Sequence, residues 1–406
     1  MDITKRQLSG KTRTEHDLLG NKEVPVEYYF GVQTMRALEN FNISRVRLHF
    51  FPELIKALAM VKEAAACANR DLGLIDGHVA QAIIEACEEV RQGKFDEHFV
   101  VDMVQGGAGT STNMNANEVI ANRALEILGH QRGEYKYCHP NNDVNMSQST
   151  NDAYPTAVKI ALINSITKLQ ASLKWLVEAF HAKGAEFAHV IKMGRTQLQD
   201  AVPMTLGQEF EAYAANLAEE VERLEQNYKL FLEVNMGATA IGTGINADPD
   251  YSPLCIKYLR EITGLPVVAA TNMIEATNDT GAFVMNSSAL KRLAVKLSKI
   301  CNDLRLLSSG PRTGLNEINL PPMQNGSSIM PGKINPVIPE VVTQVAFHVI
   351  GNDTTITMAA EAGQMELNAF EPVVFYSLFS SITSMTGAVN TLVKNCILGI
   401  TANEKR

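Results

Sequence analysis

The sequence predicts an all-α protein organised around a bundle of long helices. Apolar residues recur in steps of four and three through several long runs, which is the spacing of one helix face. Strict alternation of apolar and polar residues, the pattern of a half-buried strand, is scarce. Polar segments rich in glycine and proline separate the runs. The stepping favours near-antiparallel packing of the helices in a bundle.

Residues 1–149 are predicted to form a smaller, mostly helical N-terminal domain. The segment up to about residue 50 has no clear period. An apolar stripe from Pro52 indicates one helix, and Val79 to Val90 indicate a second. The glycine-rich segment 105–118 leads into a third helix, which we expect to end near Gly129. No Gly-Lys-Ser/Thr follows these glycines, so they do not indicate a nucleotide site.

Residues 150–397 are predicted to form a central long-helix bundle domain of five helices. Helices of this length need partners along their apolar faces. Alanine and serine on neighbouring faces indicate that other sides are covered too, so we expect the bundle to assemble into a larger oligomeric bundle. A structural coiled-coil protein would show the same stripes, but it would not need polar loops between them. The apolar runs are 162–180, 210–228, 290–307, 341–356 and 374–396.

The net charge and the cysteine pattern indicate which partners and which cellular compartment the protein has. With 36 basic and 44 acidic residues, the net charge of −8 argues against nucleic acid or an anionic membrane as the main partner. The six cysteines form no C-x-x-C pair, and no histidine stands at metal-ligand spacing. The N-terminal segment is polar and lacks the apolar core of a signal peptide. We therefore expect a cytoplasmic protein with reduced thiols that is neither secreted nor membrane-bound.

Polar residues cluster at four places where a helical run begins or ends. The first three clusters contain Thr110, the triplet Ser149–Thr150–Asn151 and the pair Thr196–Gln197. Taken singly, each is explained by helix capping or turn formation. The fourth is the loop Gly326–Val337, whose glycines and prolines cannot continue a helix.

The loop Gly326–Val337 is predicted to lead into a helix N-terminus, because an apolar pattern follows its last proline. Ser327, Ser328, Lys333 and Asn335 then stand beside free backbone N–H groups at the positive end of that helix. Such a set can hold an anion and stabilise a neighbouring oxyanion. The alternative is an ordinary polar connection between helices.

The residues Gly326–Asn335, GSSIMPGKIN, resemble the signature of the aspartase/fumarase superfamily, lyases that eliminate ammonia, water or an amine to release fumarate. The other clusters resemble the family's remaining blocks in order and approximate spacing, from Leu18 to Asn403. Gln197, where fumarases typically carry histidine, and Gly351–Asn368 make the chain more similar to the aspartases. The resemblance implies reversible deamination of L-aspartate to fumarate and ammonia. It also implies a homotetramer with sites assembled from several subunits.

The resemblance implies a role for each candidate residue. Ser327 would remove the Cβ proton, and Lys333 and Asn335, with Thr196, would hold one carboxylate of the substrate. Hydroxyl groups would surround the other carboxylate, where an aci-carboxylate intermediate develops. No metal or organic cofactor is expected, although some relatives are activated by magnesium. The hydroxyls are those of Thr110, Ser149, Thr150 and Ser328, and the groups that accept from the ammonium are Asn151 and Gln197.

Two other functions and one structural expectation accompany this reading. The same scaffold serves fumarate hydratases, and some aspartases carry histidine where this chain has Gln197, so that residue alone does not decide the substrate. Some superfamily members are non-enzymatic structural proteins, so a helical scaffold is the other alternative. Family members usually continue into a small C-terminal domain, and we expect residues 398–406 to be the stub of that absent domain.

Overall fold

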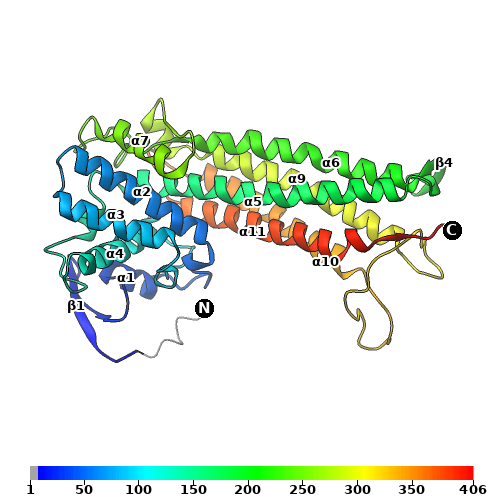
Figure 1. Cartoon of the computed structure of the whole chain (residues 1–406), viewed down its shortest axis with the longest axis horizontal. Coiled ribbons are helices and arrows are strands. Elements are labelled where there is room, and N and C mark those ends of the chain that lie inside the picture. Colours follow the sequence, from blue (N-terminus) through cyan, green and yellow to red (C-terminus); the bar gives the residue numbers. More distant parts are fainter. Residues whose placement is uncertain (1–7, 406) are drawn as a thin grey trace. The chain divides into compact units, whose positions relative to one another are not determined.

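The computed structural model describes residues 8–405, and these residues are predominantly helical (Figure 1). The predicted all-α class is confirmed. Strands in the described range occur only as four two-stranded pairs, of which one is parallel and three are antiparallel. The pairs are β1 (Thr12–Asp17) with β2 (Gly20–Pro25), β3 (Ile191–Thr196) with β4 (Gln199–Thr205), the parallel β5 (Glu233–Val234) with β6 (Val268–Ala269), and β7 (Ile318–Asn319) with β8 (Thr401–Ala402).

The first of two compact units contains the described part of Met1–Asn164, together with Lys229–Ala282 and Ile356–Tyr376. The three helices predicted in the N-terminal region are confirmed. The second of them is capped by Asp76, whose side chain accepts from the N–H groups of His78 and Val79. The helices of this unit are α1 (Val32–Asn40), α2 (Pro52–Asp71), α3 (Gly77–Arg91), α4 (Thr110–Ile127), α7 (Tyr251–Thr263) and α8 (Met273–Asn278).

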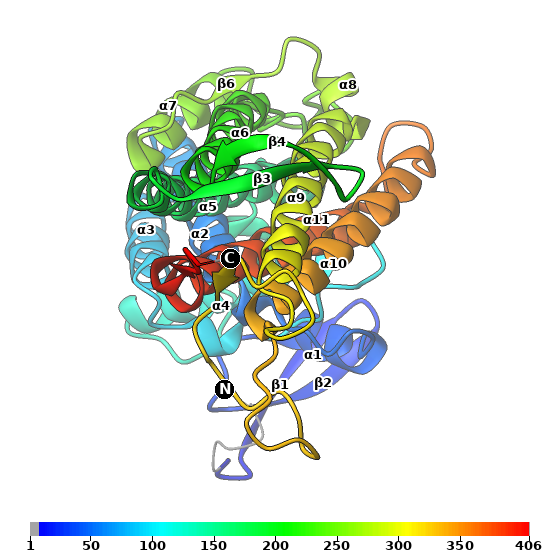
Figure 2. The same cartoon turned by 90° about the vertical axis from the view of Figure 1, so that its right-hand side faces the viewer.

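The second unit contains Ser165–Tyr228, Phe283–Thr355 and the described part of Ser377–Arg406, and it is a bundle of five long helical segments. The hairpin β3–β4 joins two of them (Figure 2). The predicted domain boundaries at residues 149 and 397 stay a prediction, because the two units are grouped by contact and share four helices. The helices are α5 (Thr150–Glu186), α6 (Leu206–Tyr228), α9 (Gly281–Leu307), α10 (Val337–Glu361) and α11 (Glu371–Asn395).

The predicted apolar runs supply the core of the five-helix bundle. Near one end of α5, the rings of Phe187 and Phe210 meet edge to face with centroids 5.3 Å apart. Burial of these runs removes large apolar areas from water, which is the main stabilising contribution. Fully buried members of the runs include Leu169, Leu173, Leu176, Phe180, Leu217, Leu293, Ile300, Leu304, Val389 and Leu392.

One segment of the described chain, Glu371–Gly399, is long and apolar enough to cross a membrane by length and composition. No charged residue lies between Glu371 and Lys394. The core helix of a soluble protein has the same properties, and 61% of the most apolar stretch is buried within the protein. The segment is therefore weak evidence for a membrane span, and the expectation of a non-membrane protein stays a prediction.

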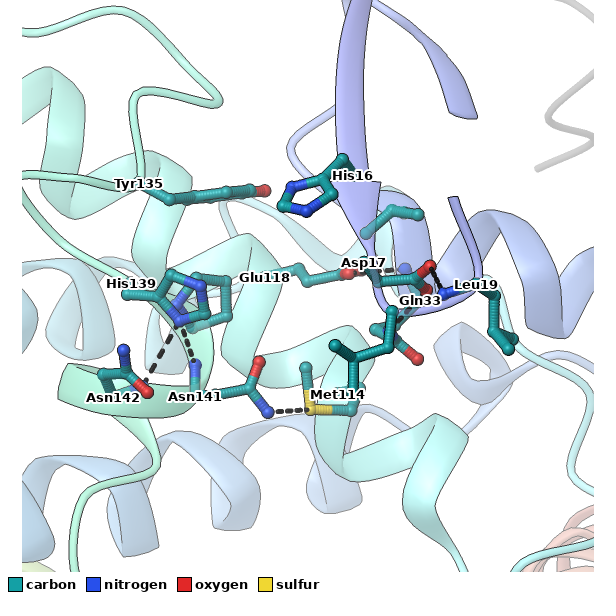
Figure 3. Close-up of a pocket in the computed structure, with 13 residues that line it drawn as sticks. His16, Asp17, Leu19, Gln33, Met114, Glu118, Tyr135, His139, Asn141 and Asn142 are labelled. Atoms are coloured by element: carbon teal, nitrogen blue, oxygen red, sulfur yellow. Dashed lines mark hydrogen bonds between the residues drawn. The ribbon is translucent and has the colours of Figure 1, made fainter. Parts of the chain in front are cut away.

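Helix α1 lies in the segment for which the sequence indicates no period, and its start is capped by residues from other elements. Glu118 of α4 accepts from the N–H groups of Gly31 at 2.8 Å and Gln33 at 2.7 Å. Glu15 of β1 accepts from the N–H group of Val32 at 2.9 Å. Both carboxylates are buried, so the first turn of α1 depends on distant partners. Glu118 and the start of α1 also line a cavity of about 530 Å³ (Figure 3).

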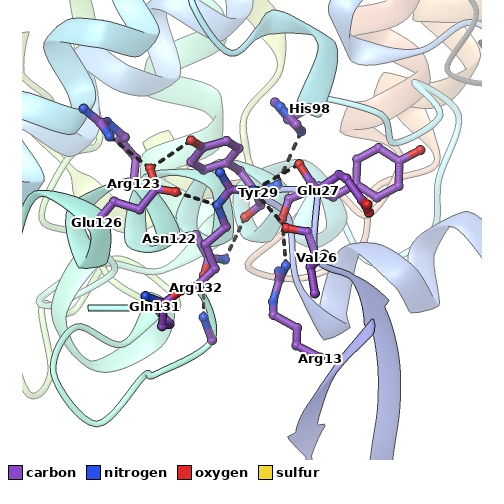
Figure 4. A network of polar contacts seen from close by, with 12 residues as sticks. Arg13, Val26, Glu27, Tyr29, His98, Asn122, Arg123, Glu126, Gln131 and Arg132 are labelled. Atoms are coloured by element: carbon purple, nitrogen blue, oxygen red, sulfur yellow. Dashed lines mark hydrogen bonds and ion pairs between the residues drawn. The ribbon is translucent and has the colours of Figure 1, made fainter. Parts of the chain in front are cut away.

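The chain before α1 is held against α4 and the turn that follows it (Figure 4). The Tyr29 hydroxyl donates to Glu126 at 2.8 Å, and Asn122 Nδ2 donates to the Tyr29 carbonyl at 2.7 Å. The Arg132 guanidinium lies 3.7 Å from the centroid of the Tyr29 ring. Arg132 also donates to the Val26 carbonyl at 2.9 Å. These partners are far apart in sequence, so no local pattern indicates them.

A buried carboxylate occupies the first position of α11. The Glu371 residue is 3% exposed, and its Oε2 atom has no hydrogen-bond partner among the described residues. Burial raises the pKa of Glu371 from 4.5 to about 8, and the Lys159 ammonium opposes this only in part. The folded protein therefore retains a proton that the unfolded chain releases.

We expect this group to make the folded protein less stable as the pH rises from about 5 to about 8. In that window the unfolded chain binds fewer protons than the folded chain, so rising pH favours unfolding. Glu371→Gln cannot ionise and should lose this dependence. Melting temperatures measured across the window should show the variant gaining on the wild type as the pH rises. A constant difference at all pH values would contradict the assignment.

Candidate active site

Thr110 lies at the exposed start of α4, directly after a glycine that no other residue can replace without strain. Gly109 has φ +90°, and a Cβ atom there would lie 2.0 Å from the Tyr154 ring. The Thr110 hydroxyl donates to the Gly107 carbonyl at 2.8 Å. The first N–H groups of α4 are paired in part from outside the helix, since Thr110 N donates to the Gly107 carbonyl at 3.1 Å and Thr112 N to Gln105 Oε1 at 3.0 Å.

The start of α5, which carries three predicted site residues, is held by the fully buried Asp152. Its carboxylate accepts from the N–H groups of Ser149 at 2.9 Å, Gly237 at 3.2 Å and Thr239 at 2.9 Å. Burial raises the pKa of Asp152 to about 6, and these N–H groups oppose the rise. The carboxylate is therefore ionised at neutral pH. The Ser149 hydroxyl oxygen in turn accepts from the N–H group of Asn151 at 3.1 Å.

Behind Thr150 lies Lys62 of α2, a buried lysine that the sequence analysis missed. Its Nζ atom donates to the side-chain oxygens of Asn113 at 2.7 Å, Asn145 at 2.9 Å and Gln148 at 2.8 Å. Burial lowers the pKa of Lys62 to about 7, and the nearby Asp152 carboxylate opposes this in part. Since Lys62 Nζ donates to the Asn113 side-chain oxygen, Asn113 Nδ2 is the atom that donates to Thr150 Oγ1 at 3.1 Å. The charged pair Lys62–Glu63 within the apolar, alanine-rich stretch AMVKEAAA is the signal that could have identified Lys62.

Thr196 and Gln197 lie at the tip of the hairpin β3–β4, so the prediction that this cluster marks a helix end is wrong. Both side chains are exposed. Gln197 and Leu198 have φ values of 54° and 62°, which is typical of the two central residues of a tight type I′ turn. An exposed hairpin buries too little of either face to produce strong alternation in its sequence, which explains why the strands were not predicted.

The loop Gly326–Val337 leads into α10, and its predicted helix start is confirmed. The loop is closed on itself. The Gly326 N–H group donates to the Lys333 carbonyl at 3.2 Å, and Asn335 Nδ2 donates to the Gly326 carbonyl at 2.5 Å. A Cβ atom at position 326 would lie 2.4 Å from Asn335 Nδ2, so the closure requires glycine.

Within this closed loop the chemically important groups remain available. Ser327 Oγ accepts from the Met330 N–H group at 3.0 Å. Ser328 and Lys333 are exposed, and Lys333 forms no ion pair with any residue of the described range. A lysine ammonium on this polar loop, without an ion-pair partner among the described residues, is suited to bind an anion.

The predicted site residues are divided between the two compact units. Thr110, Ser149, Thr150 and Asn151 belong to the first unit. The second unit holds the remaining six, which are Thr196, Gln197, Ser327, Ser328, Lys333 and Asn335. None of these ten residues lines the cavity of Figure 3.

Comparison with known proteins decides the family. A family profile described as a lyase matches residues 20–351, which is most of the chain. The chain belongs to this lyase family. The lyase is 63% identical to the aspartate ammonia-lyase of Pseudomonas fluorescens over 395 residues, a match that covers 97% of this chain and 83% of that protein.

Solved structures agree with the family assignment. The lyase superposes with a TM-score of 0.95 on the fumarate lyase:delta crystallin from Brucella melitensis bound to cobalt, at 59% identity and covering 97% of this chain and 86% of that one. For the class II fumarase from Schistosoma mansoni the TM-score is 0.93 at 36% identity, with the same coverage. The predicted superfamily and the helical-bundle fold are therefore confirmed.

The comparisons do not reach the roles of individual side chains in the lyase. Each role assigned above to one of the ten site residues stays a prediction. The described residues contain no group of three or more histidine, cysteine, aspartate or glutamate side chains that could hold a metal ion. The expectation that the protein needs no resident metal or organic cofactor stays a prediction as well.

Proposed function

We propose that this lyase catalyses the reversible deamination of L-aspartate to fumarate and ammonia. The observation that carries the proposal is its similarity to proteins named aspartate ammonia-lyase. Identity is 63% for the Pseudomonas fluorescens protein and 59% for the protein of Escherichia coli strain K12, over nearly the whole chain. The four polar clusters supply the donors that a dicarboxylate substrate needs.

The proposed reaction begins with removal of a Cβ proton, which places extra negative charge on a substrate that already carries carboxylates. Hydrogen-bond donors must therefore surround the carboxylate on which this charge develops. Thr150 Oγ1 accepts from Asn113, and Ser149 Oγ accepts from the N–H group of Asn151. Both hydroxyl protons thus remain available to donate to a substrate oxygen.

Ser327 is the proposed base. A serine hydroxyl is a weak base in water, so the step requires a donor beside its oxygen and exclusion of solvent. The Met330 N–H group supplies one such donor, and the Lys333 ammonium on the same loop supplies positive charge. Lys333, Asn335 and Thr196 are proposed to hold the second carboxylate, and Asn151 and Gln197 to accept from the departing ammonia.

Fumarate hydration is the second candidate, because the class II fumarase of Schistosoma mansoni shares the fold at 36% identity. The lower identity favours the ammonia-lyase. A non-enzymatic scaffold is the third candidate, since delta crystallin appears in the name of one structural relative. The polar, self-closed loop around Ser327 argues against a purely structural role.

We expect purified protein to form fumarate from L-aspartate faster than from L-malate. The absorbance of fumarate provides a direct assay for both substrates under the same conditions. A preference for L-malate would contradict the ammonia-lyase assignment and favour the fumarase. A folded, helical protein that turns over neither substrate would support the scaffold.

Ser327→Ala should abolish nearly all turnover while leaving substrate binding largely intact, because the carboxylate contacts belong to other residues. Lys333→Ala should instead impair both kcat and KM, since it removes the cation of the anion site. Steady-state kinetics on both variants separate these effects. If Ser327→Ala kept more than about a tenth of the wild-type kcat, a barrier change below about 1.4 kcal/mol, the base would have to be another residue.

We further propose a homotetramer that forms through the long helices. Between Glu340 and Glu361, the only charged residue of α10 is Asp353. Asp353 is buried, and its carboxylate accepts a hydrogen bond from Lys291 Nζ at 2.5 Å. An exposed helix face without charge is unusual for a surface that faces water and typical of a subunit contact. The exposed residues of this face include Val341, Gln344, Phe347, Gly351 and Thr354.

A cytoplasmic location without a resident cofactor completes the proposal. All six cysteines are buried and unpaired, as is usual in a reducing compartment. The elimination as proposed uses hydroxyl, amide and ammonium groups that the chain itself supplies.

We expect Phe347→Glu to shift the protein from a tetramer to smaller species, because a charge would be buried at the subunit contact. Light scattering coupled to size-exclusion chromatography measures this directly. Ile43→Glu is the matched control, since Ile43 is 64% exposed against 63% for Phe347 but lies outside the long helices. Tetramers in both variants, or a wild type that is monomeric at micromolar concentration, would contradict the proposal.

A further inference from the structure

Glu317 is a residue to which the reaction proposed above assigns no role, and it joins two segments of the second unit. It lies immediately before β7, on the stretch of chain that leads to the Ser327 loop. Its carboxylate forms ion pairs with two side chains of β3, Arg195 Nη2 at 2.5 Å and Lys192 Nζ at 3.0 Å. Thr196, a predicted substrate-binding residue, directly follows Arg195 in the sequence. The ion pairs therefore meet at the base of the hairpin tip.

The backbone of Glu317 is fixed on both sides. Its N–H group donates to the Leu307 carbonyl at the end of α9, at 2.8 Å. Its carbonyl accepts from the Asn403 N–H group at 2.9 Å, next to the pairing of β7 with β8. Because its backbone is anchored in this way, the Glu317 side chain can hold Arg195 and Lys192 of the hairpin in place.

The charges around Glu317 are shielded from water and balanced. The side chains of Lys192 and Glu317 are 7% and 14% exposed. Lys192 also donates to Glu209 of α6 at 2.5 Å, so two carboxylates face two cations. Burial tends to raise the pKa of Glu317, but Arg195 and Lys192 outweigh it and the pKa is lowered. The carboxylate is ionised at neutral pH, and its loss would leave Arg195, among residues 8–405, with Asp200 at 4.0 Å as its one remaining ion-pair partner.

The hairpin has few other supports near its tip. Thr196, Gln197 and Leu198 are exposed, and the strand pairing is interrupted by a bulge between Met193 and Arg195. The two turn residues adopt left-handed conformations that side chains seldom adopt. The tip thus depends on the ion pairs just behind it.

We propose that Glu317 is a positioning residue that clamps the hairpin tip, and with it Thr196 and Gln197, to the segment leading to the Ser327 loop. The kinetic part of this inference rests on the proposed function, because it assumes that Thr196 contacts the substrate. The structural part does not. Within one chain, the clamp makes two candidate substrate-binding segments share a common anchor.

Hydrogen–deuterium exchange tests the clamp without reference to activity. In Glu317→Gln, which keeps the shape but removes the charge, amides of residues 191–205 should exchange faster, while those of the buried bundle helices should not. Glu219→Gln is the matched control, because Glu219 also bridges two basic side chains, Arg292 and Lys296, but is exposed. If Glu317→Gln fails to fold, Arg195→Gln breaks the same ion pair from its other side. Unchanged exchange in the hairpin would overturn the proposal.

Kinetics separate positioning from a general loss of structure. We expect Glu317→Gln to raise the KM for L-aspartate about tenfold, the scale of losing one charge-assisted contact. In a background that carries both Thr196→Ala and Gln197→Ala, the same change should have little further effect, since both side chains that it positions are already truncated. Equal effects in both backgrounds would overturn the proposal. A wild type without turnover would instead refute the proposed function, and exchange would still decide whether the clamp exists.

Discussion

A helix cannot pair the backbone N–H groups of its own first turn, and much of this structure is arranged around that constraint. At α5 the Ser149 hydroxyl oxygen accepts from the first-turn N–H group of Asn151, and the buried Asp152 holds Ser149 in place by accepting from its N–H group. At α1 the same need is met by Glu118 and Glu15 from other elements. The polar groups that collect at helix starts are also the groups that can face a substrate, so capping and binding use the same places in the fold.

The long helices could be predicted because their signal is local and repeated. Each apolar run presents the same stepping many times, so an error at one position does not change the conclusion. The start of α10 was predictable for a different reason, since glycine and proline restrict the backbone of the preceding loop whatever surrounds it. The ten site residues came mainly from the resemblance, because hydroxyl and amide side chains at a helix start look the same whether they cap or bind.

What the sequence could not predict depends on partners distant in the chain. Lys62 is stabilised in the interior by the side-chain oxygens of Asn113, Asn145 and Gln148, which all accept from it. Helix α1 relies on carboxylates from β1 and α4. The hairpin β3–β4 has no strong alternation, and its anchor, Glu317, is more than a hundred positions further along the chain. No local window contains both members of any of these pairs.

The contact between Gly109 and Tyr154 has a consequence for how sequences of this kind can diverge. The Tyr154 ring occupies the space of a Cβ atom at position 109, and the backbone there is left-handed as well. A smaller residue at position 154 would remove the collision but not the backbone strain. No single second substitution would therefore allow another residue at position 109. We expect glycine to be kept there while neighbouring positions change. Because the steric contact and the left-handed backbone each require glycine independently, the start of α4 is expected to tolerate little sequence change at this position.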